Sequence, residues 1–448
     1  ISAVVNGVHA RTWLSPFLYN LILRYGGPSS MNELADFNMW NIIQQIPDNE
    51  LWSVREAGRR QLIAYARKRL IKQDQRRGTL TGDIIKTNDI LDPKALTIGF
   101  ARRFVTYKRG NLFFKNLKRL KNILSNSERP VQIVIAGKAH PADQMGKEII
   151  KQIFEIANQS DFRNRVVFLE DYDLDVASFL TQGVDVWLNT PRRPLEACGT
   201  SGMKVAMNGG LNVSILDGWW DEAYTPDVGW AIGERQEYAS VEIQDQIESD
   251  LLYATLEREI IPMFYDRDAD NVPRNWIKMI KSSMKELGTG FNSHRMLRDY
   301  SERFYLKAEE IYGRLTSNDY TDAKALAAWR QKIATEWSKI DISKVESQTR
   351  DFIFKGTKLD VKAWIRLGTI LPDDVAVECY HGPLDINHQI DGGQKIRMTQ
   401  QAQEGDTTVF GASIPCSRGG RYGFTVRILA AHKNLAVNFL PGLIRWFE

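Results

Sequence analysis

Leu96-Thr-Ile-Gly-Phe-Ala101 and Val131-Gln-Ile-Val-Ile-Ala136 are short apolar runs, and the segment between them has apolar residues at helical spacing. Similar apolar runs follow at residues 165–169, 184–188 and 212–216. Segments that suit helices lie between the runs, at residues 111–125, 143–158, 175–182 and 203–209. Buried strands that alternate with helices predict a doubly wound parallel sheet, and hence an α/β fold.

The flanking parts of the chain have different patterns. Helices are expected across residues 15–75, 241–287, 291–315 and 320–340, and a turn-rich linker at residues 79–93. Beyond about Asp341, apolar and polar residues alternate, which predicts a small antiparallel β domain. We therefore expect a first domain at residues 1–340, which includes a helical segment at 15–80 and C-terminal helices at 291–340, and a second domain at 341–448.

Composition excludes several classes of protein. With 59 basic and 55 acidic residues the net charge is only +4, which does not favour nucleic-acid binding. No apolar stretch is long enough to span a membrane. Three cysteines provide no disulfide framework, which favours a reducing, cytoplasmic location. The chain begins at Ile1 without a signal peptide, and we expect it to be part of a longer protein.

A basic segment directly follows the first apolar run. Arg102-Arg-Phe-Val-Thr-Tyr-Lys-Arg109 contains four cations, and ligands of doubly wound sheets bind at the carboxyl ends of strands. Arginine offers bidentate donors to phosphate and lysine offers a point charge. The segment therefore indicates an anion site, although a solvated basic turn would have the same composition.

A loop of small residues precedes Lys204. Gly199-Thr-Ser-Gly202 opens a predicted helix, where free backbone N–H groups can hold a phosphate. A lysine just inside that helix could form a Schiff base. The alternative is an ordinary helix start with a solvent-exposed Lys204 and a loop carboxylate at Glu196.

Two adjacent tryptophans form the third feature. Asp217-Gly-Trp-Trp-Asp-Glu222 combines aromatic rings with carboxylates, as sugar-binding sites do. Core packing of Trp219 and Trp220 explains the same pattern equally well.

Together these blocks resemble one family, the α-glucan phosphorylases, which act on glycogen, starch and maltodextrin. Glu196-Ala-Cys-Gly-Thr-Ser-Gly-Met-Lys204 resembles the family's pyridoxal-lysine signature, Glu-Ala-Ser-Gly-Thr-Gly-Asn-Met-Lys. Arg102-Arg103 with Tyr107-Lys108 resembles its phosphate-binding block. Further similar blocks lie at residues 6–13, 136–141, 168–172 and 208–218. Gly-Trp-Trp after Asp217 and the β domain resemble the short bacterial and archaeal branch.

The resemblance implies the second Rossmann-like domain of a two-domain glycosyltransferase-B (GT-B) fold. It implies reversible phosphorolysis, in which inorganic phosphate attacks a terminal α-1,4-glucosyl unit and releases glucose 1-phosphate with retention. It implies pyridoxal 5′-phosphate as cofactor, with its phosphate rather than its ring transferring the proton, and no metal. The expected partners are an N-terminal domain of the same enzyme, without which activity should be low, and further copies in a homo-oligomer.

The same resemblance assigns roles to individual residues. Lys204 would form the Schiff base, and the other residues expected around the cofactor are Arg102, Tyr172, Trp13, Gly199, Thr200 and Ser201. Inorganic phosphate would be held by the catalytic residues Arg103 and Lys108. Glucose hydroxyls would be bound by Asn6, Glu196, Cys198 and Gly199. Cys198 stands where the family signature has serine, and Arg102 where many members have lysine.

Two other functions remain open. A nucleotide-sugar glucosyltransferase on the same fold, such as a glucan synthase, would use the basic residues and Glu196 but would not need Lys204 as a Schiff base. A non-enzymic glucan-binding protein would place its function in residues 341–448.

Overall fold

The structure is a computed structural model that describes residues 3–78, 90–348, 353–385, 387–417 and 419–447. Contacts divide the chain into two compact units, Ile1–Tyr300 and Ser301–Glu448. Most of the linker predicted at residues 79–93 lies outside the described residues.

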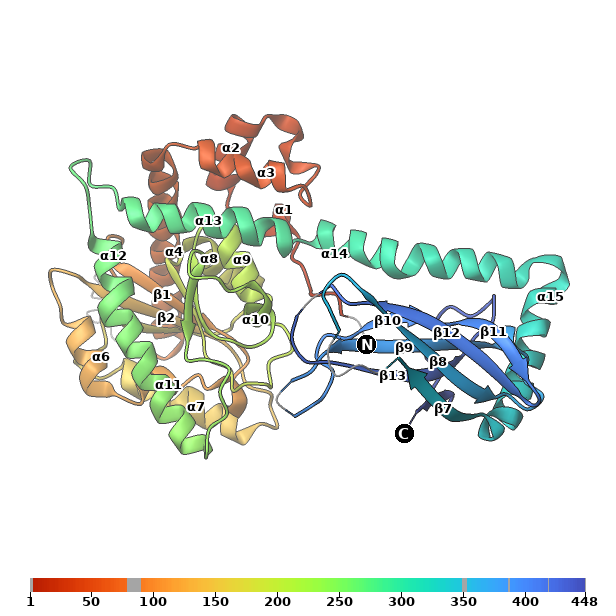
Figure 1. The fold of residues 1–448 in the computed structure, drawn as a ribbon. Coiled ribbons are helices and arrows are strands. Elements are labelled where there is room, and N and C mark those ends of the chain that lie inside the picture. The colour runs from red at the N-terminus through yellow and green to blue at the C-terminus, as the bar shows by residue number, and fades with distance from the viewer. Residues whose placement is uncertain (1–2, 79–89, 349–352, 386, 418, 448) are drawn as a thin grey trace. The chain divides into compact units, whose positions relative to one another are not determined.

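A six-stranded parallel sheet forms the centre of the first unit (Figure 1). Its strands are β1 (Leu96–Ala101), β2 (Val131–Ala136), β3 (Val166–Leu169), β4 (Val186–Asn189), β5 (Leu211–Ile215) and β6 (Gly229–Ile232). The order β3-β2-β1-β4-β5-β6 matches that of doubly wound dinucleotide-binding sheets, whose ligand crevice lies where the order reverses, at the carboxyl ends of β1 and β4. The five predicted strands are confirmed, and β6 is an additional strand.

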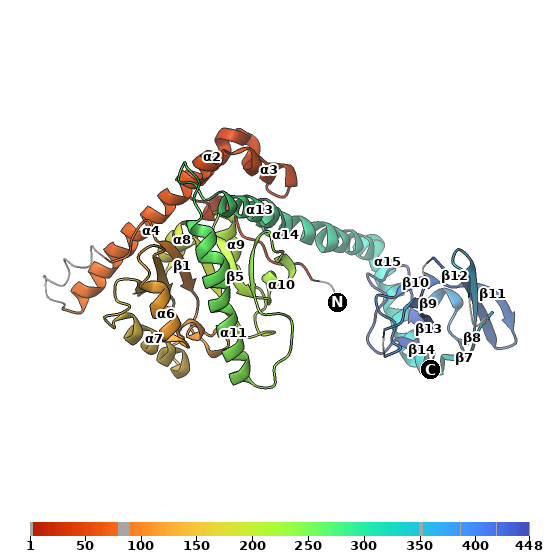
Figure 2. The same ribbon diagram turned by 60° about the vertical axis from the view of Figure 1, so that its left-hand side comes forward.

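Helices cover both faces of this sheet (Figures 1 and 2). Ile133 and Ile135 of β2 belong to a core that includes α6 (Leu117–Leu124) and α7 (Gln144–Ala157). Val134 and Ala136 point to the opposite face, where the core includes α4 (Asp48–Arg76) and α8 (Leu174–Gly183). Successive side chains of a strand point to opposite faces of the sheet. Because both faces are covered by helices, apolar residues are needed at odd and at even positions of β2.

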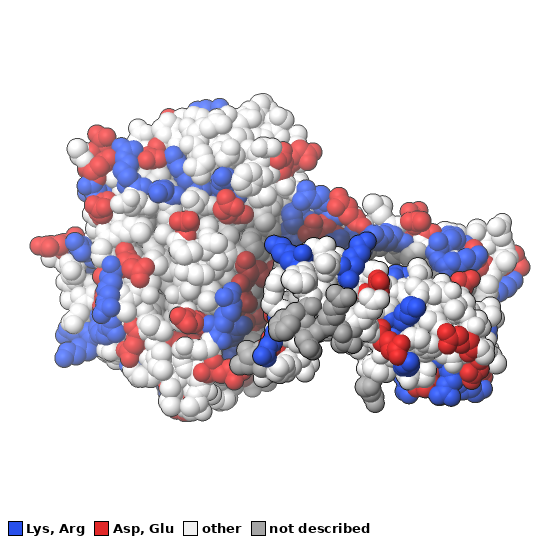
Figure 3. Space-filling model, in the orientation of Figure 1, with Lys and Arg blue, Asp and Glu red and all other residues white. Residues whose placement is uncertain are grey.

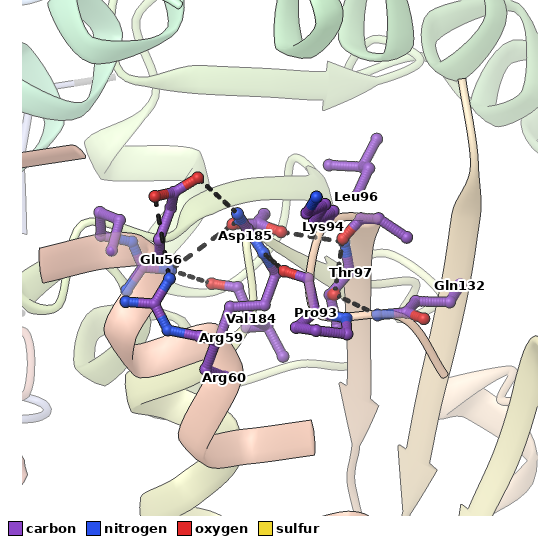
Figure 4. Close-up of polar contacts among 12 residues, drawn as sticks. Glu56, Arg59, Arg60, Pro93, Lys94, Leu96, Thr97, Gln132, Val184 and Asp185 are labelled. Atoms are coloured by element: carbon purple, nitrogen blue, oxygen red, sulfur yellow. Dashed lines mark hydrogen bonds and ion pairs between the residues drawn. The ribbon is translucent and has the colours of Figure 1, made fainter. Parts of the chain in front are cut away.

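A buried ionic network joins α4 to the edge of the sheet at which its strands begin (Figure 4). This edge is opposite the carboxyl ends of the strands. Asp185 accepts hydrogen bonds from Arg59 Nη1 at 2.5 Å and from the backbone N–H of Thr97 at 2.9 Å. Arg55 donates to the carbonyl oxygens of Gln182 and Asn208 at 2.8 and 2.7 Å. The two arginines and Asp185 are almost fully buried, so Asp185 offsets part of the burial cost of the cations, and backbone carbonyl oxygens accept the other hydrogen bonds of Arg55.

The remaining helices of the first unit surround these layers. They are α1 (Ala10–Trp13), α2 (Pro16–Gly26), α3 (Phe37–Asn41), α9 (Ser201–Met207), α10 (Trp219–Ala223), α11 (Val241–Thr255), α12 (Ile261–Tyr265), α13 (Arg274–Gly290) and α14 (Ser293–Tyr300). The expectation of helix throughout residues 241–287 was wrong at residues 266–273. Asp268 accepts hydrogen bonds from the N–H groups of Asp270 and Val272, and Pro273 follows, so a turn separates α12 from α13.

The second unit combines helix α15 (Leu306–Glu336) with two four-stranded antiparallel sheets. The sheets have the orders β10-β9-β13-β14 and β11-β12-β8-β7. Their strands are β7 (Asp341–Ser347), β8 (Lys358–Arg366), β9 (Val375–Pro383), β10 (Gln394–Arg397), β11 (Thr399–Glu404), β12 (Thr407–Pro415), β13 (Tyr422–Ala430) and β14 (Ile444–Trp446). The predicted antiparallel β region is confirmed. The separation between the helices predicted at 291–315 and 320–340 is also confirmed, because the backbone of α15 is not helical at residues 317–320. Trp329 and Ile333 of α15 pack in the core of these sheets.

Surface charge is mixed in both units. Figure 3 shows Lys and Arg interspersed with Asp and Glu over the visible face of each unit, in line with the small net charge. No helix in the described ranges has the length and apolar character of a membrane span.

Candidate active site

The predicted site residues of the first unit gather at the carboxyl edge of its parallel sheet. Arg102 directly follows β1, Glu196 lies in the loop between β4 and α9, and Asp217 follows β5. The backbone N–H of Glu196 donates to Asp217 Oδ2 at 2.8 Å, which fixes the loop against the end of β5. This is the edge at which doubly wound sheets bind ligands.

A buried ionic cluster of Arg102, Glu196 and Lys108 occupies this edge. Arg102 pairs with Glu196 Oε2 and also donates to the side-chain oxygen of Asn189 at the end of β4. Lys108 Nζ lies 3.2 Å from the same carboxylate oxygen. Burial lowers the pKa of the Arg102 guanidinium, and the Glu196 carboxylate opposes this shift. Arg102 and Lys108 share the Glu196 carboxylate, and the Asp217 carboxylate also acts on Arg102.

The four cations of the basic segment have different environments. Arg109 has a left-handed backbone, with a φ of 46°, and its buried side chain pairs with Asp245 and Glu248 of α11. Arg103 is exposed at the same edge. The expectation of one four-cation anion site was therefore wrong for Arg109, whose charge is already neutralised by two carboxylates.

Lys204 lies in the first turn of α9, and its side chain is half-buried. Its Nζ is 3.5 Å from the centroid of the Trp13 ring. Burial lowers the pKa of the Lys204 amine, and among the described residues no carboxylate opposes this effect. A lowered pKa increases the neutral fraction of the amine, which is the nucleophilic form.

The loop before α9 and the segment after β3 carry the other residues that were expected around the cofactor. Gly199 has a φ of 82°, which favours glycine, and a Cβ there would lie 3.7 Å from Arg102. Ser201 accepts a hydrogen bond from Trp187 Nε1 at 3.2 Å, and Thr200 precedes the helix as its N-cap residue. Tyr172 is half-buried, and burial raises the pKa of its hydroxyl, while Arg102 opposes the shift.

The N-terminal segment reaches the site through a close backbone contact. Val8 exchanges backbone hydrogen bonds with Phe291 and Ser293, and a Cβ on Gly7 would lie 2.1 Å from the Asn292 carbonyl oxygen. Only glycine permits this approach. It places Asn6 within hydrogen-bonding reach of the Cys198 thiol, whose pKa is raised by burial and lowered by Asn6.

Trp219 and Trp220 are not part of a sugar-binding surface. Their side chains are 2% and 0% exposed and pack in the core of the first unit. The core-packing interpretation of this motif is confirmed.

Sequence reasoning missed two asparagines that support the site. Asn189 orients Arg102, and Asn208 hydrogen-bonds the backbone of both Trp13 and Lys204. A polar residue directly after the apolar run of β4 was a usable signal for Asn189. No local pattern marks the contacts of Asn208, because its partner Trp13 is far away in the chain.

These features define an α/β protein with a candidate ligand site that contains cations and a lysine, at the switch point of a parallel sheet. The chain belongs to the carbohydrate phosphorylase family. The family model described as "Carbohydrate phosphorylase" matches residues 2–230, and the model described as "Glycogen phosphorylase C-terminal domain" matches residues 337–448.

Curated relatives match most of the chain. It is 37% identical over 446 residues to a glycogen phosphorylase of Mycobacterium tuberculosis, covering 99% of this chain and 51% of that protein. It is 35% identical over 450 residues to a maltodextrin phosphorylase of Thermococcus litoralis, covering 100% and 52%. A glycogen phosphorylase of Aquifex aeolicus is 45% identical over 312 residues, covering 68% and 44%. The chain thus spans about half the length of these relatives.

Proposed function

We propose that this chain forms the cofactor-bearing lobe of an α-1,4-glucan phosphorylase, which transfers a terminal glucosyl unit to inorganic phosphate and releases glucose 1-phosphate with retention. One observation carries the proposal. Lys204 is half-buried against the Trp13 ring without a carboxylate partner among the described residues, in the helix that follows the loop of Glu196, the carboxylate paired with Arg102 and Lys108. A structural lysine would be expected to have a counter-ion or to extend into solvent.

The residues present fit pyridoxal 5′-phosphate. Lys204 has the lowered pKa that favours covalent attachment to an aldehyde. Trp13 offers an aromatic wall beside its amine. Arg102 lies 3.7 Å from the position of a Cβ on Gly199, so a phosphate held by the loop amides would be close to a guanidinium. We therefore assign cofactor binding to Lys204, Arg102, Trp13, Tyr172 and the loop residues Gly199, Thr200 and Ser201.

When bound, the cofactor would supply a phosphate group that exchanges a proton with the substrate phosphate. Two phosphates held close together repel each other, so the site must contain excess positive charge. Arg102 would hold the cofactor phosphate, while Lys108 and the exposed Arg103 would bind and orient inorganic phosphate. The buried position of Arg102 strengthens its interaction with an anion, because water screens it poorly.

The glucosyl unit would be bound by a second group of residues, Glu196, Cys198, Asn6 and Gly199. Glu196 accepts hydrogen bonds, and the Cys198 thiol and the Asn6 amide lie together next to it. We propose that these three residues and the Gly199 amide bind glucose hydroxyls. A thiol is a weaker hydrogen-bonding group than the serine hydroxyl of the family signature, so the Cys198 contact should contribute less.

The wider organisation is also part of the proposal. We propose a GT-B arrangement in which a second lobe faces the carboxyl edge of the parallel sheet, supported by the strand order. The domain division at residues 1–340 and 341–448 and a cytoplasmic location, favoured by three unpaired cysteines, stay predictions. α-1,4-Glucan and inorganic phosphate are the proposed substrates.

The test is to incubate the chain with pyridoxal phosphate, reduce it with borohydride and map the modified peptide by mass spectrometry. Modification of Lys204 is expected. Phosphorolysis of a maltodextrin, measured as glucose 1-phosphate release, should then require both the cofactor and a protein that includes the second lobe. Glucosyl transfer from a nucleotide sugar, with Lys204 unmodified, would instead identify a glucosyltransferase and contradict the proposal.

A further inference from the structure

Asn208 is buried at the end of the helix that bears Lys204. It is 1% exposed and follows α9 as its C-cap residue. Its backbone N–H donates to the Val205 carbonyl at 3.0 Å, so it does not make the usual helical bond to Lys204. The side chain makes that bond instead, with Nδ2 donating to the Lys204 carbonyl at 2.9 Å.

The same side chain holds the segment that carries Trp13. Asn208 Nδ2 donates to the Trp13 carbonyl at 2.8 Å, and Asn208 Oδ1 accepts from the Ser15 N–H at 2.7 Å. Trp13 ends α1 and Ser15 is the N-cap of α2, so both groups lie at helix ends, where backbone donors and acceptors need outside partners. Asn208 satisfies both with one amide.

Only asparagine chemistry fits this position. Two partners of the amide are carbonyl oxygens and the third is an N–H, so the orientation of the amide is determined. An aspartate would place a carboxylate against two carbonyl oxygens. A leucine of similar size would remove the side-chain partner of the Lys204 carbonyl and of the Ser15 N–H, and would leave the Trp13 carbonyl with only a long bond from Gln182.

We propose that Asn208 is a positioning residue that holds the Trp13 ring over the Lys204 amine. The ring centroid is 3.5 Å from Lys204 Nζ, while Trp13 and Lys204 are held by the same amide through their backbone carbonyls. Apart from Asn208, Trp13 O receives a hydrogen bond from Gln182 Nε2, which is long at 3.4 Å. The inference rests on the proposed role of Lys204 as the cofactor lysine, and it assigns to Asn208 control of access to that amine.

The experiment measures acetylation of Lys204 by acetic anhydride in the cofactor-free protein, across a pH series, by peptide mass spectrometry. The rate plateau at high pH, where the amine is neutral, reports access to Lys204. Asn208→Leu and Trp13→Ala should each raise this plateau about tenfold, equivalent to about 1.4 kcal/mol in the local opening equilibrium. The double variant should show little further increase, because both changes act through one ring.

Asn212 provides a matched control. It is also 1% exposed and donates to the α9 backbone, at Gly202 O and 3.1 Å, but it has no hydrogen bond to the Trp13 segment. Asn212→Leu should destabilise the fold to a similar degree and leave the Lys204 plateau unchanged. If Asn208→Leu does not fold, Asn208→Ser supplies the same comparison with a smaller loss of contacts.

Two outcomes would overturn the inference. One is a plateau rate of Lys204 acetylation that equals the parent's in the Asn208 variants but is raised in Trp13→Ala. The other is an equal increase in Asn212→Leu, which would indicate general loosening of α9. The acetylation experiment needs no cofactor. A failure of the chain to bind pyridoxal phosphate would therefore reject the proposed function without affecting the test of Asn208.

Discussion

Replacing Glu196 by glutamine tests whether this carboxylate neutralises the cations of the site. Arg102 and Glu196 are only 6% and 8% exposed, and Lys108 Nζ lies 3.2 Å from the same carboxylate. Glutamine keeps the shape and one accepting oxygen but removes the charge. Breaking a buried ion pair costs about 3–5 kcal/mol, and because Gln still accepts a hydrogen bond we expect a loss of about 2–3 kcal/mol in the free energy of unfolding.

Inorganic phosphate should reverse this loss. With Glu196 neutral, Arg102 and Lys108 lose the carboxylate that they share, and a bound anion can replace it. A ligand at a hundred times its Kd that binds only the folded state stabilises it by about 2.7 kcal/mol. Thermal unfolding in phosphate and in chloride at equal ionic strength measures the difference. We expect phosphate to stabilise Glu196→Gln more than the parent.

Glu248→Gln is the matched control, because it removes the charge of another buried arginine partner. Arg109 and Glu248 are both 2% exposed, and Asp245 also lies 3.0 Å from Arg109. This variant should lose stability without gaining any response to phosphate. Equal phosphate responses in the Glu196 and Glu248 variants would refute the assignment of an anion site to Arg102 and Lys108.

Further predictions concern the lysine, the phosphate contacts and the fold. Lys204→Met should abolish covalent retention of pyridoxal phosphate, read by mass after borohydride. Because burial lowers the pKa of Lys204, its charged amine is a penalty to the folded state below that pKa. Lys204→Met should therefore be at least as stable as the parent at neutral pH, with any gain lost as pH rises through the lowered pKa towards that of unfolded lysine. Unfolding midpoints across pH check this. In an active enzyme, Arg103→Ala and Lys108→Ala should each raise the phosphate KM about tenfold to a hundredfold, since each removes a contact of about 1.5–3 kcal/mol; an unchanged KM in both would contradict their roles. Asp185→Asn should lower the free energy of unfolding by about 3–5 kcal/mol in denaturant titration, because Arg59 loses its buried counter-charge, and the phosphate KM should not change.

Much of the fold follows from local patterns. Parallel strands buried on both faces need continuous apolar runs, and β1 and β2 have the predicted bounds. The sixth strand, β6, was missed because Gly229-Trp-Ala-Ile232 contains glycine and alanine and so lacks a continuous run of large apolar residues. The turn at residues 266–273 was missed because apolar residues on both sides suit helices.

The residue types of the candidate site were predictable, but the contacts between them were not. Lys204, Glu196 and the basic segment were recognisable as reactive or charged residues, and their places after strands located them at one edge of the sheet. Their pairing was not predictable, because Arg102 and Glu196 are 94 residues apart. Arg109 and Arg103 look alike in the sequence, yet one is buried in ion pairs and the other is exposed.

The α/β class, five of the six strands of the parallel sheet and the resemblance to a family were predictable, since these depend on residue type and spacing along the chain. The neutralisation of Arg109, the burial of Trp219 and Trp220 and the hydrogen bonds of Asn208 to Trp13 and Lys204 became known from the folded structure. The physical reason is that ion pairs, burial and hydrogen bonds depend on distances between groups that only chain folding brings together.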